Sequence, residues 1–151
     1  MGLPRAILIV CILIVTGAAP SSHQVSSSGA APAAGSQAYA FPSGAGLLLF
    51  YVRPDRTADF DSVLKRMAEV LDKADTPPRK QQAAGWRMFK SVEAPKDSVI
   101  YVFVLDPVVA GSDYDPVKVL SEGLPTEAHA LYESLKSATL RIERMGLAKI
   151  R

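Results

Sequence analysis

Two short segments of the chain are apolar at nearly every position. They are GLLLFYV, residues 46–52, and SVIYVFVLDP, residues 98–107. Alternate side chains of a β-strand point to opposite faces of its sheet. In the second segment both faces are apolar: Val99, Tyr101, Phe103 and Leu105 on one, and Ile100, Val102 and Val104 on the other. Each segment therefore predicts a strand whose two apolar faces must both be shielded from water by other parts of the protein.

A helix is predicted between these strands. In residues 57–75 the apolar positions follow the i, i+3, i+4, i+7 spacing of an amphipathic helix. Thr57 or Asp59 is expected to cap its start, and Thr76-Pro77-Pro78 to end it. Residues 79–85, RKQQAAG, fit a short helix or a loop equally well.

The remaining elements are shorter. WRMFKSVE, residues 86–93, predicts a strand of mixed polarity that forms a hairpin with the 98–107 strand. A helix is expected to start at Pro116 with Asp115 as its cap and to end at Gly123. Another should run from about residue 125 to 137. Residues 139–150 predict a weak last strand, with Gly146 as a candidate bulge.

The resulting order, β-α-β-β-α-β, is that of the ferredoxin-like split arrangement, an α+β fold with an antiparallel sheet. Its first and third strands lie in the centre of the sheet and its second and fourth at the edges. The polarity agrees, because the two doubly apolar segments are the first and third strands.

The second face of this sheet lacks a predicted cover. The two main helices can cover only one face, and an exposed apolar face of this size is unusual in a soluble monomer. A second copy of the chain, packed sheet against sheet about a two-fold axis, is the favoured solution. The alternative is that the segment before the domain folds back over the sheet through Tyr39 and Phe41.

The N-terminal third has a different composition. Residues 1–19 resemble a secretory signal peptide, with Arg5, an apolar run over 6–15 and small residues at 16–19. Because Pro20 disfavours the most obvious cut, the alternative is an uncleaved membrane anchor formed by residues 6–19. Residues 20–43, rich in Ser, Ala, Gly and Pro, predict a flexible linker, and 44–151 the folded domain. We therefore expect an exported protein, periplasmic or secreted.

The element order and the doubly apolar central strands resemble the dimeric α/β-barrel superfamily, which includes antibiotic-biosynthesis-monooxygenase-like proteins. QQAAGWRMFKS, YVFVLDPVV and DYDPVKVLSE are also similar to segments of uncharacterised exported bacterial proteins. The resemblance covers the chain from about Gly44 onward. It implies a dimeric barrel built from two sheets, often with a ligand cavity between sheet and helices.

No catalytic constellation accompanies this fold. Asparagine, which cofactor-independent oxygenases and haem-degrading members of the superfamily typically need, is absent from the sequence. No cofactor and no metal site are predicted, and Asp115 near Asp113 and Glu122 is interpreted as a helix cap. The candidate pocket residues are Tyr51, Arg53, Trp86, Tyr101 and His129. Tyr51, Arg53 and Tyr101 are expected to share the sheet face opposite Ile100, Val102 and Val104.

The charges exclude a nucleic-acid-binding surface. The chain has 17 basic and 15 acidic residues, and only Arg5 of these lies before residue 44. The domain is thus nearly neutral, without the basic stripe of a nucleic-acid binder. The favoured hypothesis is a non-enzymatic, exported, dimeric protein that binds a small apolar or amphipathic ligand, or a partner. The alternatives are an oxygenase-like or haem-handling enzyme, with haem on His129, and a purely structural envelope protein.

Overall fold

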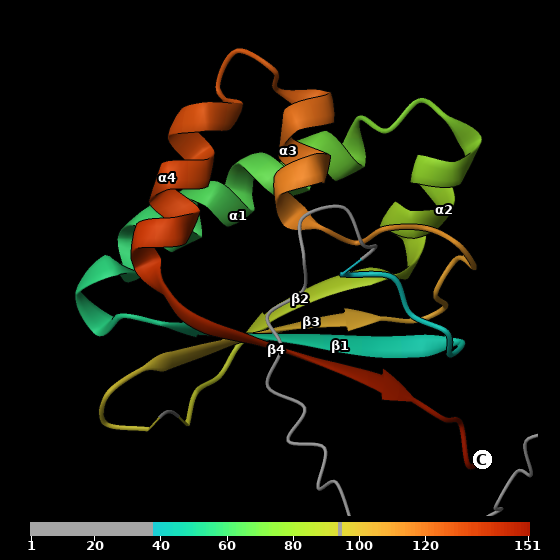
Figure 1. Cartoon of the computed structure of the whole chain (residues 1–151), viewed down its shortest axis with the longest axis horizontal. Coiled ribbons are helices and arrows are strands. Elements are labelled where there is room, and N and C mark those ends of the chain that lie inside the picture. Colours follow the sequence, from blue (N-terminus) through green and yellow to red (C-terminus); the bar gives the residue numbers. More distant parts are fainter. Residues whose placement is uncertain (1–37, 94) are drawn as a thin grey trace, which may run out of the picture. The chain divides into compact units, whose positions relative to one another are not determined.

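The computed structural model describes residues 38–93 and 95–151 (Figure 1). The predicted signal peptide, 1–19, and most of the predicted linker lie outside the described residues. The elements are β1 (Ala45–Val52), the 3₁₀ turn η1 (Pro54–Arg56), α1 (Thr57–Asp72), α2 (Pro77–Gly85), β2 (Trp86–Lys90), β3 (Val99–Leu105), α3 (Pro116–Gly123), α4 (Ala128–Ala138) and β4 (Thr139–Leu147). No helix within the described residues is long and apolar enough to cross a membrane.

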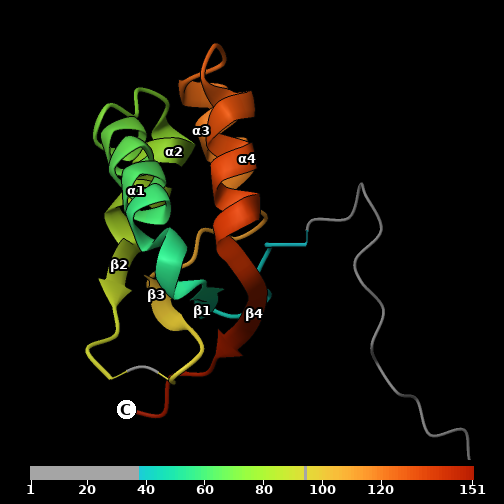
Figure 2. The ribbon, with the colours of Figure 1, turned by 90° about the vertical axis from the view of Figure 1, so that its left-hand side faces the viewer.

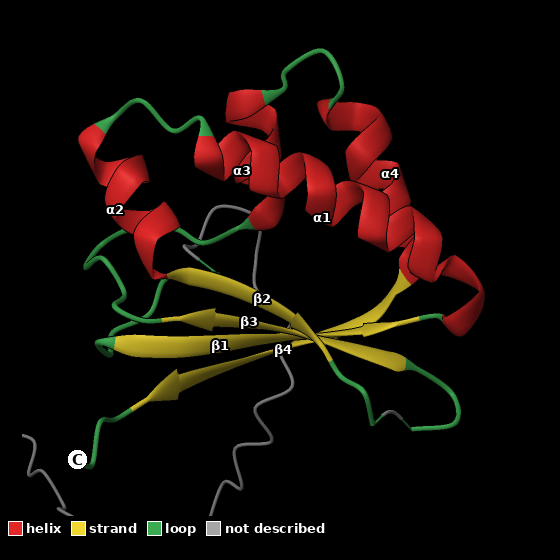
Figure 3. Ribbon diagram, turned by 180° about the vertical axis from the view of Figure 1, so that it is seen from behind, coloured by secondary structure: helices red, strands yellow, loops and turns green. Residues whose placement is uncertain are grey.

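The four strands form one sheet in the order β2-β3-β1-β4, and every neighbouring pair is antiparallel. The doubly apolar strands β1 and β3 are central, and the strands of mixed polarity, β2 and β4, are the edges. This confirms the ferredoxin-like α+β fold predicted from the sequence. All four α-helices lie on the same side of the sheet (Figure 3).

Three details at the ends of helices follow from local chemistry. Residues 79–85, which the sequence left undecided, belong to α2, whose first residue is proline. The predicted cap of α3 is confirmed, because an Asp115 Oδ atom accepts a hydrogen bond from the Val117 amide at 2.9 Å. The predicted cap of α1 was wrong. That helix follows directly from η1, and the Thr57 hydroxyl donates back to the Pro54 carbonyl instead.

The core lies between the sheet and the helices and is rich in aromatic rings. Phe50 and Phe103 pack with ring centroids 4.6 Å apart, and the Phe60 and Tyr101 centroids are also 4.6 Å apart. All four residues are at most 1% exposed. Burying side chains of this size contributes roughly 1.5–3 kcal/mol each, so this layer dominates the stability of the domain.

The strand register defines the other face, which we call the open face. Leu49 pairs with Val102, and Leu47 pairs with Val104, so their side chains lie on the side away from the helices. No described segment covers this face (Figure 2). The open face consists of Ala45, Leu47, Leu49, Tyr51, Arg87, Phe89, Ile100, Val102, Val104, Arg141, Glu143, Met145 and Leu147.

The register also corrects the predicted position of one tyrosine. Tyr51 pairs directly with Ile100, and residues directly opposite share a face. Tyr51 therefore lies on the open face beside Ile100, whereas Tyr101 lies in the core. Arg53 follows the end of β1 and is exposed. The prediction that these three residues share one face of the sheet is therefore wrong.

The segment Tyr39–Ser43 packs at the helix side of the sheet. Phe41 is 5% exposed and makes an edge-to-face contact with Tyr114, with ring centroids 6.0 Å apart. Its ring lies so close to Gly46 that a Cβ atom there would stand 2.4 Å from it. The packed domain thus begins before Gly44, and neither Tyr39 nor Phe41 covers the open face.

The edge strand β4 departs from regular pairing at Leu140. Tyr51 pairs with Arg141 but Val52 pairs with Thr139, which leaves Leu140 as an extra residue. Gly146, the predicted bulge, pairs regularly with Gly46. The bulge lies where β4 emerges from α4, so it re-aims the first residues of the strand.

Candidate ligand pocket

A pocket of about 370 Å³ lies between α3, α4 and the edge strand β4. Its volume falls within the range of small-molecule sites, roughly 300–1,000 Å³. Most of the lining is hydrocarbon, from Phe50, Pro116, Val117, Leu135, Leu140 and Ile142. The polar or amphipathic residues that line it are Tyr39, Asp115, Tyr132, Lys136, Thr139 and Arg141.

The junction of α4 and β4 forms one wall of this pocket. The chain passes from Ala138 straight into Thr139, whose hydroxyl donates to the Leu135 carbonyl at 2.7 Å. The bulge at Leu140 follows immediately. Leu140 and Ile142 remain 49% and 37% exposed, although both are apolar. Exposed apolar groups beside a cavity indicate a surface that gains from being covered.

Tyr39 enters the pocket from the N-terminal segment. Its carbonyl accepts a hydrogen bond from the Tyr114 amide at 3.2 Å, and the neighbouring Ala40 forms an isolated bridge with Asp113. Burial raises the pKa of the Tyr39 hydroxyl, and the Asp115 and Asp113 carboxylates raise it further. The phenol of this lining residue therefore stays protonated and remains a hydrogen-bond donor.

Asp115 places a carboxyl group at the start of α3. Burial raises its pKa, and the hydrogen bond from the Val117 amide acts in the opposite direction. The first turn of a helix favours a negative charge through its free amide groups. These amide groups offset only part of the cost of burial, because the net shift of the Asp115 pKa is upward.

The two basic residues of the lining differ in where their charges lie. The Arg141 guanidinium stacks 3.6 Å from the centroid of the Tyr51 ring and pairs with Glu143, so it lies on the open face. The Lys136 ammonium instead lies 5.6 Å from the centroid of the Tyr132 ring, beside the pocket. Within the described residues, Lys136 has no carboxylate at ion-pairing distance.

A second cavity, of about 500 Å³, lies among α1, α2 and α3 and has a different character. Four of its six charged lining residues form ion pairs with each other, Arg66 with Glu69 and Arg79 with Glu122. Arg66 bonds both Glu69 and Glu127, and Arg79 bonds Glu122 and the Gln82 side chain. The charges of this cavity therefore stabilise the contacts between helices, and fewer remain for a ligand.

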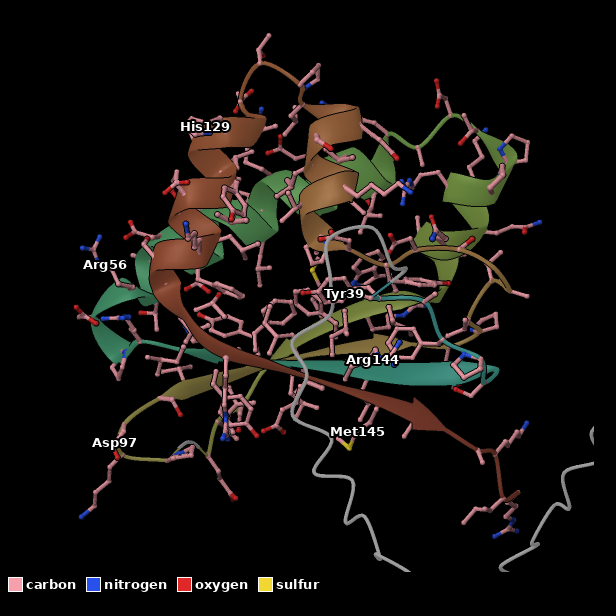
Figure 4. All side chains as sticks on the ribbon, viewed as in Figure 1. Tyr39, Arg56, Asp97, His129, Arg144 and Met145 are labelled. Atoms are coloured by element: carbon pink, nitrogen blue, oxygen red, sulfur yellow. The ribbon has the colours of Figure 1, made fainter. Side chains whose placement is uncertain are left out.

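The structure does not bring the predicted pocket residues together. Tyr51 is on the open face, Arg53 is exposed, and Trp86 and Tyr101 are in the core. The Trp86 ring packs 5.3 Å from that of Tyr114, and its buried Nε1 has no hydrogen-bond partner within the described residues. His129 is exposed at the end of α4 that is remote from the sheet (Figure 4). None of the five lines the pocket.

The residues that do line the pocket were missed for identifiable reasons. The sequence indicates Asp115 only as a helix cap and predicts that Tyr39 belongs to the linker. Leu140 and Ile142 were visible only as part of a weak strand. Within the described residues, no three His, Cys, Asp or Glu side chains lie close enough together to hold a metal ion. The Asp113 side chain accepts a hydrogen bond from the Asp115 amide in the loop, and the Asp115 side chain caps α3.

The chain was also compared with known proteins. No family model matches it, and no curated protein matches it. Among solved structures, it is similar to a dimeric ferredoxin-like protein from an uncultured marine organism. That likeness has 19% sequence identity, covers 72% of this chain and 93% of the other, and has a TM-score of 0.39. The fold assignment therefore rests on the strand order and register described above.

Proposed function

We propose that this chain is an exported, homodimeric protein that binds a small amphipathic molecule in the pocket between α3, α4 and β4. The observation that carries the proposal is the lining of that pocket, a mainly hydrocarbon wall with Tyr39 and Lys136 among its polar residues. Ligand pockets typically combine an apolar wall with a few polar groups that fix the orientation of the ligand.

The homodimer is proposed from the open face. Its central positions are aliphatic, and its arginines and Glu143 lie on the edge strands. This is the distribution of an interface with an apolar centre and a polar rim. With about 4.8 Å between strands and about 3.4 Å per residue, the face spans a few hundred Å², which is the size of the apolar patches that mark interaction sites on protein surfaces.

Export is proposed from residues 1–19 and tested separately. The full chain, expressed in a bacterial host, is expected to appear outside the cytoplasm with a new N-terminus close to residue 20 or a few residues later. N-terminal sequencing of the fractionated protein measures this directly. A chain that keeps residue 1 and sediments with membranes would instead identify residues 6–19 as an anchor.

Pocket binding is tested with an uncharged fluorophore, N-phenyl-1-naphthylamine. Its emission should rise on titration with the protein, because the dye moves from water to an apolar site. Ile142→Trp fills the pocket and is expected to weaken binding at least tenfold. Ser137→Trp, on an exposed α4 position that does not line the pocket, is the control. Equal binding by both variants would show that the dye binds elsewhere and would overturn the proposal.

A further inference from the structure

The charged residues around the pocket differ in whether they are free to pair with a ligand. This difference indicates which class of ligand the pocket takes. Asp115 is bonded to the Val117 amide at the start of α3, where the helix dipole favours its negative charge. The Arg141 guanidinium stacks on Tyr51 at the open face. Lys136 is therefore the charged group beside the pocket whose charge no described carboxylate offsets.

The position of Lys136 suits the headgroup of a ligand. It lies in the last turn of α4 and lines the pocket together with Leu135, which is 5% exposed. A lysine side chain can follow an apolar wall with its methylene groups while its ammonium stays in water. The contact with the Tyr132 ring, 5.6 Å from Nζ to the centroid, keeps the ammonium at the edge of the pocket.

Asp115, at the start of α3, determines the orientation of the ligand in the pocket. Asp115 lines the same pocket from the start of α3, and its carboxylate would repel an anionic group placed beside it. An anion is therefore favoured only at the α4 end, near Lys136. The hydrocarbon part of such a ligand would then contact Leu135, Leu140 and Ile142.

We propose that the pocket takes an amphipathic carboxylate, a small monocarboxylic acid whose carboxylate pairs with Lys136 and whose apolar body lies against the α4–β4 wall. The inference rests on the proposed ligand-binding function and names its ligand class. An exposed ion pair contributes roughly 0.2–1 kcal/mol, which corresponds to an affinity gain of at most about fivefold. Contacts of the apolar body with the pocket wall supply the rest of the binding free energy.

The test compares three probes of equal chain length, octanoate, octan-1-ol and octylamine, by competition with N-phenyl-1-naphthylamine at low ionic strength. Octanoate is expected to bind about three- to fivefold more tightly than octanol, and octylamine no better than octanol. In Lys136→Gln, octanoate should fall to the affinity of octanol, while octanol is unchanged. Lys118→Gln, an exposed lysine of α3 that does not line the pocket, should keep the preference.

The outcomes separate the ligand class from the pocket itself. Equal affinities for octanoate and octanol, or a preference for octylamine, would overturn the carboxylate proposal and leave the pocket standing. A preference that survives in Lys136→Gln would overturn the role of Lys136. Failure of all three probes and of the dye would overturn the proposed function together with this inference.

Discussion

The two faces of the sheet are both apolar but are built from different side chains. The face under the helices is aromatic, with Phe50, Tyr101 and Phe103 at most 1% exposed. The open face is mainly aliphatic, and its central residues, such as Leu49 and Val102, are half-buried in the single chain. The helix-covered face can bury its residues within one chain, whereas the open face cannot.

This difference reflects what each face packs against. Large rings fill the uneven gaps between helices and a sheet, and edge-to-face and tilted ring contacts add to their burial. Short aliphatic side chains leave a flatter surface, which suits a second sheet packed face to face at about 10 Å. The composition of the open face therefore favours a second copy of the sheet over a helix or a coil as its cover.

The largest expected change in the free energy of unfolding comes from a substitution on the sheet face that the helices cover. Phe103→Ala removes a ring that contacts both Phe50 and Trp86 and should lower the free energy of unfolding by about 3–5 kcal/mol. Urea denaturation at fixed protein concentration measures this loss. Val104→Ala, the next residue on the open face, is the matched control. An equal loss in both variants would remove the distinction between the two faces.

The second prediction concerns the centre of the open face. Val102 pairs with Leu49 on one side and Phe89 on the other, so Val102→Asp places a carboxylate in the proposed dimer interface. Burying an unpaired charge costs several kcal/mol. We expect the dimer dissociation constant to rise by at least about 30-fold, roughly 2 kcal/mol, as measured by sedimentation velocity.

The control for this variant is Lys65→Asp, which introduces an acid at an exposed position of α1. It should leave the dimer intact. Native mass spectrometry of the unsubstituted protein provides the independent check. A monomer at micromolar concentration would contradict the dimer, and another partner would then have to cover the open face.

The sequence predicted the fold because its signals are local. The amphipathic spacing of Phe60, Val63, Met67 and Leu71 is confirmed by their burial against the sheet. The doubly apolar segments became the central strands. Periodicity is a property of single segments, so it can be read without knowing what they contact.

The position of Tyr51 and the pocket depend on contacts between distant segments. A shift of one residue in strand register moves every side chain to the other face, and no single-strand pattern specifies the pairing of Tyr51 with Ile100. The pocket needs Tyr39 to meet α3, and it needs the bulge at Leu140. Both are tertiary features without a sequence period.

The third prediction concerns Tyr101, which lies on the sheet face that the helices cover. The Tyr101 hydroxyl donates to an Asp61 carboxylate oxygen at 2.5 Å, and the Lys90 ammonium lies 3.1 Å from the other oxygen of that group. Tyr101→Phe should lower the free energy of unfolding by about 1–2 kcal/mol, because a partly buried hydrogen bond to a charged group is lost. Thermal denaturation measures the change.

Alkaline pH provides a second readout of the same residue. Burial, and then the hydrogen bond to Asp61, raises the pKa of the Tyr101 phenol above 10.0. The folded state therefore holds this proton more tightly than the unfolded chain does. The contribution to stability is complete below about pH 10 and is lost as the pH rises through the higher pKa of the folded state. Tyr101→Phe should lack this loss, and an unchanged alkaline profile would contradict the burial of the hydroxyl.

The smallest effect is expected at the tyrosine of the open face. The Tyr51 hydroxyl donates to Glu143 at 3.1 Å, and Arg141 stacks on the ring. Tyr51→Phe keeps the ring and its stacking and removes only a half-exposed hydrogen bond, so the free energy of unfolding should change by no more than about 0.5 kcal/mol. Tyr101→Phe is its matched partner, because each tyrosine donates to one carboxylate. A loss at Tyr51 as large as that at Tyr101 would mean that the proposed dimer buries this end of the open face as completely as the helices bury the other face.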